Sequence, residues 1–224
     1  SNDETRHYLN GIFIHPTVSN KRSYLTGVAT DSHRLSSSSI PVENLDNFKP
    51  FILPKKTVFQ LCNLLQERQE KVSINSSETK IQFTIGNSKI ISKIIDGKFP
   101  DYSKVVPKDN NKLLFVNAKD FINSIERVTT VSIDRKEGLK LTLGKGQIQL
   151  FVNSSSSGEG KELLKADYNS EDLTISFNSR YLLDIASEIE DEKLGMNLKD
   201  AVSPVLIQDK KDKESYFVIM PMKI

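Results

Sequence analysis

Asp31, Ser32 and His33 are the residues of this sequence whose types match the acid, nucleophile and base of a hydrolase. Such chemistry needs the base within hydrogen-bonding reach of the nucleophile, with the acid orienting the base. Three adjacent residues on a turn cannot adopt that geometry. The sequence therefore predicts a protein that is not an enzyme and has no catalytic residue. A hydrolase using Asp31 and His33 stays open as an alternative, and His33→Ala would abolish its turnover.

Groups that could hold a metal ion or a cofactor are scattered along the chain. His7, His15 and His33 do not have the spacing of metal ligands, and a zinc site is not expected in a chain whose single cysteine is Cys62. The glycine-containing stretches, Lys145-Gly146 and Asn153–Gly160, lack the phosphate-loop pattern and fit hairpin connections. We expect no metal and no cofactor.

Composition sets the class of protein. A chain of 224 residues, 37% of them hydrophobic, can bury the core of one large or two medium domains. Cys62 lies among leucines, which predicts a small core residue, and a lone cysteine excludes an internal disulfide. With no signal segment and no apolar run near the ~20 residues of a membrane span, the sequence predicts a cytoplasmic protein. The net charge of +2, with a mildly basic first half, permits only a loose contact with a polyanion.

The end of the chain has an unusual composition. Tyr216–Met220 is a β-prone apolar run that predicts a buried strand, and Pro221 must end its pairing because proline has no N–H. Met220 and Met222 then flank a rigid proline, where flexible side chains could line a groove for apolar side chains of other proteins. The alternative is a last core strand with an apolar end.

Short strands and single helices must position these residues. In the first half, the pattern predicts strands at Leu9–His15, Tyr24–Thr30 and His33–Ile40, with a turn at Pro16–Asn20 and a break at Pro41–Pro50. Phe51–Pro54 then leads into a helix whose apolar stripe is Val58, Phe59, Leu61, Cys62, Leu64 and Leu65. Three further strands are predicted at Val72–Asn75, Lys80–Ile85 and Lys89–Ile94, the last two joined by a turn at Gly86-Asn87.

The second half repeats this arrangement twice. Strands that end in a helix N-cap are predicted at Leu113–Asn117 and Thr174–Asn178, each followed by an amphipathic helix. The first helix is predicted at Ala118–Val128, with Phe121, Ile122, Ile125 and Val128 on one face. Further strands are predicted at Leu139–Leu143, Gln147–Asn153, Glu162–Asp167, Leu194–Leu198, Val205–Ile207 and the C-terminal run, with a connection at Ser154–Gly160. The units start near Phe51, Leu113 and Thr174, a period of about 60 residues that indicates a repeated architecture. The sequence thus predicts an α+β protein of repeated units, each a helix packed on antiparallel sheet, in two domains, 1–107 and 108–224. The first domain lacks an opening strand and helix, so we expect an N-terminally truncated chain.

Four separated motifs stand out along the chain, at Arg6–Gly11, Val28–Leu35, Asp96–Tyr102 and Val218–Ile224. They resemble the matching segments of the bacterial sliding clamp, the DNA polymerase III beta subunit. The resemblance covers the whole chain and implies a DNA clamp fold, with 1–107 as most of the middle domain and 108–224 as the C-terminal domain. It also implies a processivity factor for DNA replication that closes a homodimer ring around DNA. With the first domain absent, we expect this chain alone to be monomeric or abnormally associated.

The resemblance implies sequence-independent contact with double-stranded DNA, because a ring holds by topology and needs only weak phosphate contacts. The implied DNA-facing residues are Arg6, Tyr8, Lys55, Lys56, Lys119, Arg127 and Arg180. On the last two helices, ordinary solvated faces stay an alternative, because Asp120, Glu126, Asp184 and Glu188 share them. Thr130 and Val131 match dimer-interface positions, and the alternative for them is an ordinary helix-to-strand connection.

The resemblance also implies a pocket between the middle and C-terminal domains for partner segments of the Gln-Leu-x-Leu-Phe type. Its partners would be the DNA polymerase III catalytic subunit, the clamp loader and repair polymerases. The matching residues are Leu9, Thr30, His33, Arg34, Leu35, Pro100, Lys104, Val105, Tyr181, Val218, Met220, Pro221 and Met222.

Some positions depart from the family pattern. Ser32 stands where Gly is common, Pro204 where Ser is frequent, and Lys104 and Lys223 where Arg is frequent, which puts the peptide preference in doubt. A repeated β-rich scaffold or adhesion module without a DNA role stays open as an alternative function.

Overall fold

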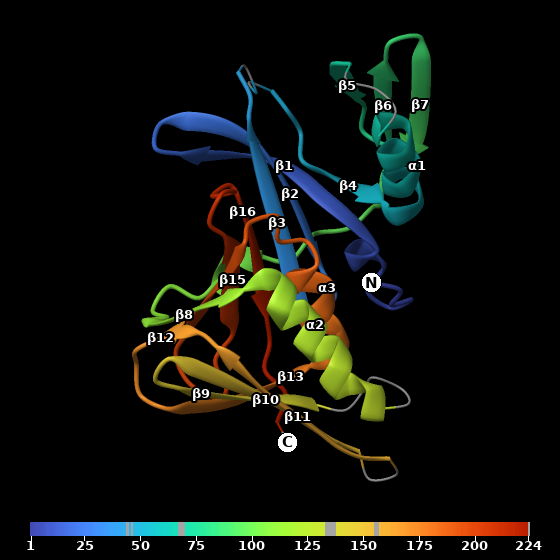
Figure 1. Cartoon of the computed structure of the whole chain (residues 1–224). Helices are drawn as coiled ribbons and strands as arrows, with labels where there is room; N and C mark the ends of the chain where they lie inside the picture. Colours follow the sequence, from blue (N-terminus) through green and yellow to red (C-terminus); the bar gives the residue numbers. More distant parts are fainter. Residues whose placement is uncertain (44, 46, 67–69, 133–137, 155–156, 224) are drawn as a thin grey trace. The chain divides into compact units, whose positions relative to one another are not determined.

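The computed structural model describes residues 1–43, 45, 47–66, 70–132, 138–154 and 157–223. They form two compact units (Figure 1). The first comprises Ser1–Ser32 and Ser37–Asp101, and the second comprises His33–Ser36 and Tyr102–Ile224. Each unit combines antiparallel strands with few helices, which confirms the predicted α+β class. No helix in the described part of the chain is both long and apolar enough to cross a membrane.

The second unit contains two antiparallel sheets. One runs in the order β12 (Asp167–Tyr168), β8 (Lys112–Asn117), β14 (Lys193–Leu198), β15 (Val205–Asp209) and β16 (Ser215–Ile219). The other runs in the order β11 (Gly158–Lys165), β10 (Gln147–Ser154), β9 (Gly138–Gly144) and β13 (Leu173–Asn178). Its helices are α2 (Ala118–Val128) and α3 (Ser179–Ala186), with single 3₁₀ turns η2 (Tyr102–Lys104) and η3 (Thr129–Val131).

One apolar core joins these sheets and helices. Alternate residues of β9 are fully buried, as the period of two in a strand requires. Phe121 of α2, Phe177 of β13 and Tyr168 of β12 are among the largest buried side chains. Helices α2 and α3 pack against each other (Figure 1), so the exposed side of each helix carries its polar residues.

Both helices of the second unit begin in the same way. The backbone N–H of Asp120 donates to Asn117 Oδ1 at 3.0 Å, and that of Tyr181 donates to Asn178 Oδ1 at 3.1 Å. Each asparagine therefore satisfies one N–H of a first helical turn, which confirms the two predicted N-caps. The second cap binds the backbone N–H of Tyr181 and so fixes the position of this residue in the first turn of α3.

The first unit contains the strands that precede and follow α1, the one α-helix among its described residues. Strands β3 (Arg34–Pro41), β2 (Arg22–Thr30), β1 (Gly11–Ser19) and β4 (Phe51–Pro54) neighbour one another in that order, although the start of β3 is counted with the second unit. Helix α1 (Lys55–Gln66) follows β4, and β5 (Val72–Ser76), β6 (Lys80–Ile85) and β7 (Ser88–Lys93) form a separate sheet. The core of α1, β4 and β6 consists of Phe51, Leu53, Leu61, Ile81, Phe83 and Ile85.

Two predictions at the start of the chain are wrong. Leu9 belongs to the 3₁₀ turn η1 (His7–Leu9), and β1 continues through Pro16 as far as Ser19. The hairpin turn is only Asn20-Lys21, both at positive φ, a conformation that asparagine tolerates. Pro16 is accepted because β4 pairs only with Gly11–Ile14, so that side of β1 is an edge beyond Ile14.

The predicted apolar stripe of α1 is also partly wrong. Thr57 and Leu61 are buried, but Cys62 is exposed and Phe59 is 59% exposed. At about 100° per residue, Phe59 lies roughly 160° around the helix from Leu61, and Cys62 about 100° from it. The residues of β4 and β6 that form a core with α1 cover only its face around Leu61, so the prediction that Cys62 is a core residue is wrong.

Other strand boundaries differ by a few residues. The predicted strand Glu162–Asp167 is divided into β11, which ends at Lys165, and the separate short strand β12. Strand β11 begins at Gly158, inside the predicted connection Ser154–Gly160. Residues 155–156 of that connection, and residues 44 and 46 of the predicted break, lie outside the described residues.

Asp209 ties the end of β15 to the residues that follow α3. Its carboxylate accepts from the N–H groups of Glu190 (2.9 Å), Asp191 (3.2 Å) and Lys211 (2.8 Å), and the residue is buried. Burial alone raises the pKa of Asp209, but the N–H donors outweigh it and hold the pKa below its ordinary value.

Asp209→Asn is expected to lower the free energy of unfolding by about 2 kcal/mol, because N–H donors lose a charged acceptor. A depressed folded pKa contributes stability that is present above the unfolded pKa of about 3.9 and lost as the pH falls through the folded value. The variant should therefore lose less stability than the wild type below about pH 4. Urea denaturation at several pH values measures both effects. Asp109→Asn, at an exposed carboxylate of the same unit, is the control, and an equal loss there would refute the role of Asp209.

Candidate functional site

The tail that follows β16 is fixed by its main chain. Val218 and Ile219 are buried, and the chain then emerges at Met220, which is 39% exposed. The N–H of Met220 donates to the carbonyl of His33 at 2.8 Å, and the N–H of Met222 donates to the carbonyl of Ser176 at 2.7 Å. Pro221, which has no N–H, lies between the two anchored residues. The methionine side chains are therefore presented by a backbone that is held on both sides of the proline.

A second group of predicted residues meets at Tyr181, in the first turn of α3. The guanidinium of Arg34 lies over the Tyr181 ring, 4.3 Å from its centroid. The His33 ring is stacked with the same ring at a centroid distance of 6.2 Å. Arg34 Nη1 also donates to Asp184 Oδ2 at 2.7 Å. Because the His33 carbonyl binds Met220, this Tyr181 cluster (His33, Arg34, Tyr181 and Asp184) is joined to the tail.

The remaining residues of the predicted partner site have less distinctive surroundings. In the second unit, Leu35 is buried, Lys104 ends η2, and Val105, the next residue, is exposed. In the first unit, Leu9 is buried in η1, Thr30 ends β2, and Pro100 is exposed. The second unit thus gathers His33, Arg34, Tyr181 and the tail.

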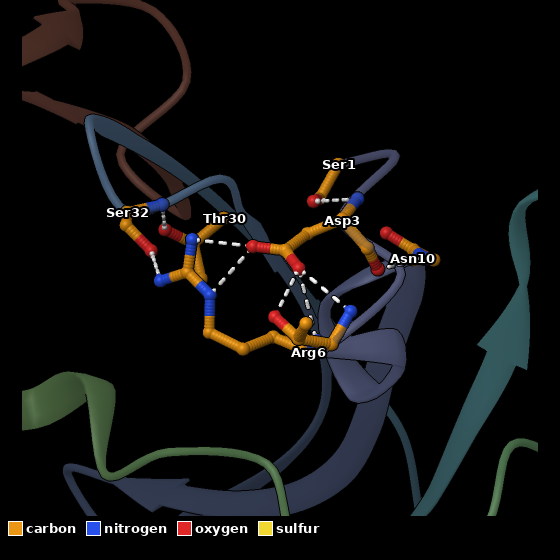
Figure 2. A network of polar contacts seen from close by, with 7 residues as sticks. Ser1, Asp3, Arg6, Asn10, Thr30 and Ser32 are labelled. Carbon is orange, nitrogen blue, oxygen red and sulfur yellow. Dashed lines mark hydrogen bonds and ion pairs between the residues drawn. The ribbon is translucent and has the colours of Figure 1, made fainter.

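Arg6 of the first unit is held in a polar network (Figure 2). Its Nε and Nη2 atoms lie 2.8 and 2.7 Å from Asp3 Oδ2, and its Nη1 donates to Ser32 Oγ at 2.6 Å. Asp3 Oδ1 accepts in addition from the N–H and hydroxyl of Thr5 and from the N–H of Arg6. The hydroxyl of Thr5 and the guanidinium of Arg6 hold the pKa of Asp3 well below its usual range. Arg6, predicted to face DNA, therefore has its charge compensated within the chain.

Ser32 adopts a backbone conformation that favours glycine. Its φ is +77°, in the left-handed region. The residue is stabilised there by its own N–H, which donates to Thr30 Oγ1 at 3.2 Å, and by the bond that its hydroxyl accepts from Arg6. The serine therefore adds to this turn a link to Arg6 that a glycine cannot make (Figure 2).

The lysines and the third arginine predicted to face DNA differ in their contacts within the chain. Lys55 Nζ donates to Asn2 Oδ1 at 2.9 Å, whereas Lys56, Lys119 and Arg180 are exposed at the starts of their helices. Tyr8 is half-buried in η1, next to His7.

Arg127 is a second predicted DNA-facing arginine whose side chain binds a carboxylate of the same chain. It makes two hydrogen bonds to the carboxylate of Glu162 on β11, one of them from Nε at 3.1 Å, and Nη2 also donates to Ser124 at 3.0 Å. The hydrogen bond from Arg127 lowers the pKa of Glu162. Since Glu162 is 35 residues away in the sequence, helix periodicity gave no signal of this pair.

Thr130 and Val131 lie in η3, the 3₁₀ turn that follows α2. The Thr130 hydroxyl donates to the carbonyl of Arg127 at 2.7 Å, and Val131 packs against the core of the second unit. Both contacts suit a helix terminus, and the interface prediction for these residues stays a prediction.

Sequence comparison gives the family. Residues 1–101 match the central domain of the DNA polymerase III beta subunit, and residues 103–223 match its C-terminal domain. The chain belongs to the DNA polymerase III beta subunit family. Over its whole length it is 35% identical to the beta sliding clamp of Caulobacter vibrioides, and over 99% of its length it is 34% identical to that of Pseudomonas putida. It spans about 60% of the length of these relatives.

Solved structures of the family agree with the fold. A DnaN sliding clamp from Bartonella birtlesii bound to griselimycin is 44% identical, with a TM-score of 0.95 over all of this chain and 61% of that one. The Caulobacter crescentus beta sliding clamp with PEG bound to a beta-motif tethering region is 35% identical, with a TM-score of 0.97 over all of this chain and 60% of that one. The chain therefore has the sliding-clamp fold, and these matches favour a clamp over an unrelated β-rich scaffold.

The sequence does not single out three acidic residues that bind the predicted arginines, Asp3, Asp184 and Glu162. The i, i+3 spacing of Tyr181 and Asp184 was the one available signal, because it places both residues on one face of α3. In the described part of the chain, no three His, Cys, Asp or Glu side chains are grouped closely enough to hold a metal ion.

Proposed function

We propose that this chain is the middle (1–107) and C-terminal (108–224) part of a DNA sliding clamp. The complete protein would be a cytoplasmic, non-catalytic homodimer that encircles duplex DNA and tethers the replicative polymerase. The observation that carries the proposal is the anchored tail joined to the Tyr181 cluster, in a chain that matches the clamp family from end to end.

Partner binding would use one surface of the second unit, formed by the tail (Met220–Met222) and the Tyr181 cluster. We call this surface the wall. Met220 and Met222 offer apolar contact, and their N–H groups are bound to the carbonyls of His33 and Ser176. Tyr181 offers an aromatic face, and its N–H is bound to the Asn178 side chain. A few apolar anchors with fixed polar neighbours suit exchangeable binding of a short peptide. We assign Gln-Leu-x-Leu-Phe segments of the polymerase catalytic subunit, the clamp loader and repair polymerases to this wall. The remaining predicted residues, Leu9, Thr30, Leu35, Pro100, Lys104, Val105 and Val218, stay assigned to the same site.

DNA contact would be weak and independent of sequence. Exposed lysines and arginines at helix starts bind phosphates as single charges, and a closed ring needs no more. Lys55, Lys56, Lys119 and Arg180 are the groups we assign to this contact, together with Tyr8. Arg6 and Arg127 would first have to exchange their carboxylate partners for phosphate. Thr130 and Val131 stay assigned to the dimer contact.

Two changes on α2 test the DNA role. Lys119→Ala is expected to weaken association with a labelled DNA duplex at low salt and to reduce the slope of log K against log salt by about 0.9. The double change Arg127→Ala, Glu162→Ala should leave affinity and slope unchanged, because the pair it removes carries no net charge. Fluorescence anisotropy over a range of salt concentrations measures both.

Three outcomes of this experiment would count against the assignment. Equal weakening by the double change would mean that Arg127 leaves Glu162 for DNA. An unaffected Lys119→Ala variant would remove α2 from the DNA contact. A wild-type chain that does not associate with the duplex at any salt concentration would contradict the DNA role itself.

A further inference from the structure

The Arg34 side chain is enclosed by two groups from one helix. Tyr181 and Asp184 lie three residues apart on α3, so they project from the same face. The Tyr181 ring lies under the guanidinium at 4.3 Å, and the Asp184 carboxylate binds Nη1 at 2.7 Å. Arg34 itself comes from the start of β3, in the His33–Ser36 segment of the second unit. One face of α3 therefore supplies both the ring that lies under Arg34 and the carboxylate that compensates its charge, although Arg34 is distant in the sequence.

This ion pair does little for stability. The side chains of Arg34 and Asp184 are 30% and 47% exposed, and pairs at such positions are weakened by solvent and salt. Two other consequences do not depend on burial. The carboxylate keeps the guanidinium over the ring, where the attraction between a cation and an aromatic face is favourable, and it cancels the positive charge of Arg34 toward a ligand.

We propose that Asp184 is a positioning residue that sets partner specificity at the Tyr181 cluster. By holding Arg34 over the ring, it makes this part of the wall electrically neutral. The wall then favours partner segments with uncharged apolar or aromatic side chains and gives no advantage to acidic ones. The proposal rests on the peptide-binding function assigned to the wall, and it adds a residue and a charge preference to that function.

Replacement of the Asp184 carboxylate should leave the positive charge of Arg34 without this compensation. In Asp184→Asn, the guanidinium loses its anionic partner and gains freedom to turn toward a ligand carboxylate. Binding of a neutral peptide should weaken because the wall is less well ordered, whereas binding of an acidic peptide should be spared or improved. A role confined to folding would weaken both peptides alike, so the ratio of the two affinities separates positioning from structure.

The experiment uses fluorescence polarisation of labelled Gln-Leu-Ala-Leu-Phe and Gln-Leu-Asp-Leu-Phe against the wild-type chain and its variants. For Asp184→Asn, we expect the ratio of acidic to neutral affinity to rise about threefold to tenfold. Glu188→Gln is the matched control, because it removes the same charge from an exposed position just beyond α3. Arg34→Gln should erase the effect of Asp184→Asn in a double variant, since the cluster then contains no cation to release.

The outcomes separate the two proposals. If the wild type binds the peptides and Asp184→Asn leaves the ratio unchanged, or if Glu188→Gln raises it equally, the specificity role of Asp184 is wrong while the binding site stands. If the effect survives in the Arg34→Gln background, Asp184 does not act through Arg34. A folded wild-type chain that binds neither peptide would overturn the partner site and this inference together.

Discussion

The double change Met220→Ala, Met222→Ala is expected to lower affinity for a Gln-Leu-x-Leu-Phe peptide by at least about tenfold, because two adaptable apolar contacts are lost from one small site. The fold should survive, since the tail is held through the N–H groups of these residues and alanine keeps both. Fluorescence polarisation measures the affinity, and circular dichroism checks the folding.

Val202→Ala is the control for the methionine variant. Val202 is an apolar residue of the same unit, 62% exposed, in the turn after β14. Its replacement should leave the affinity unchanged. Full peptide binding by the methionine variant would show that the tail is not part of the partner site.

Phe121→Ala is expected to have the largest effect on stability. Phe121 of α2 is fully buried in the core that joins both sheets of the second unit, and truncation leaves a cavity beneath the helix. A loss of about 4 kcal/mol in the free energy of unfolding is typical of such a change, and it is a large share of the stability of an ordinary domain. Urea denaturation followed by circular dichroism measures the loss.

The matched control is an exposed apolar residue of the same unit. Leu163 on β11 is 59% exposed, and Leu163→Ala should change the free energy of unfolding by no more than about 0.5 kcal/mol. If both variants lose the same amount, the packing of α2 on the sheets is not what stabilises the unit.

Local patterns predicted the second unit closely. The bounds of α2 agree with those expected from its apolar stripe, because a helix with an asparagine cap and one continuous buried face is specified by neighbouring residues. The same reasoning failed at Pro16 and Cys62. Whether a proline fits depends on where the neighbouring strand ends, and whether a helical residue is buried depends on how much of the helix is covered.

The candidate site was predictable in its residue types but not in its pairings. Two of the four motifs contain His33, Arg34 and the tail, yet nothing in the sequence showed that Arg6, Arg34 and Arg127 each bind a carboxylate. The partners of Arg34 and Arg127 lie far away along the chain, and a choice among many acidic residues is made only by the fold. The sequence therefore did not show which of the predicted cations are already paired with a carboxylate of the chain.

The position of His33–Ser36 limits how far the second unit is autonomous. These four residues are encoded within the first half of the chain but are counted with the second unit. A fragment starting at Tyr102 would lack the carbonyl that receives the Met220 N–H and the cation that lies on Tyr181. The segment His33–Ser36 thus completes the second unit with residues from another part of the chain. Dissection of this protein at its evident boundary would remove binding residues along with the neighbouring domain, so a fragment without peptide affinity would say nothing about the intact site.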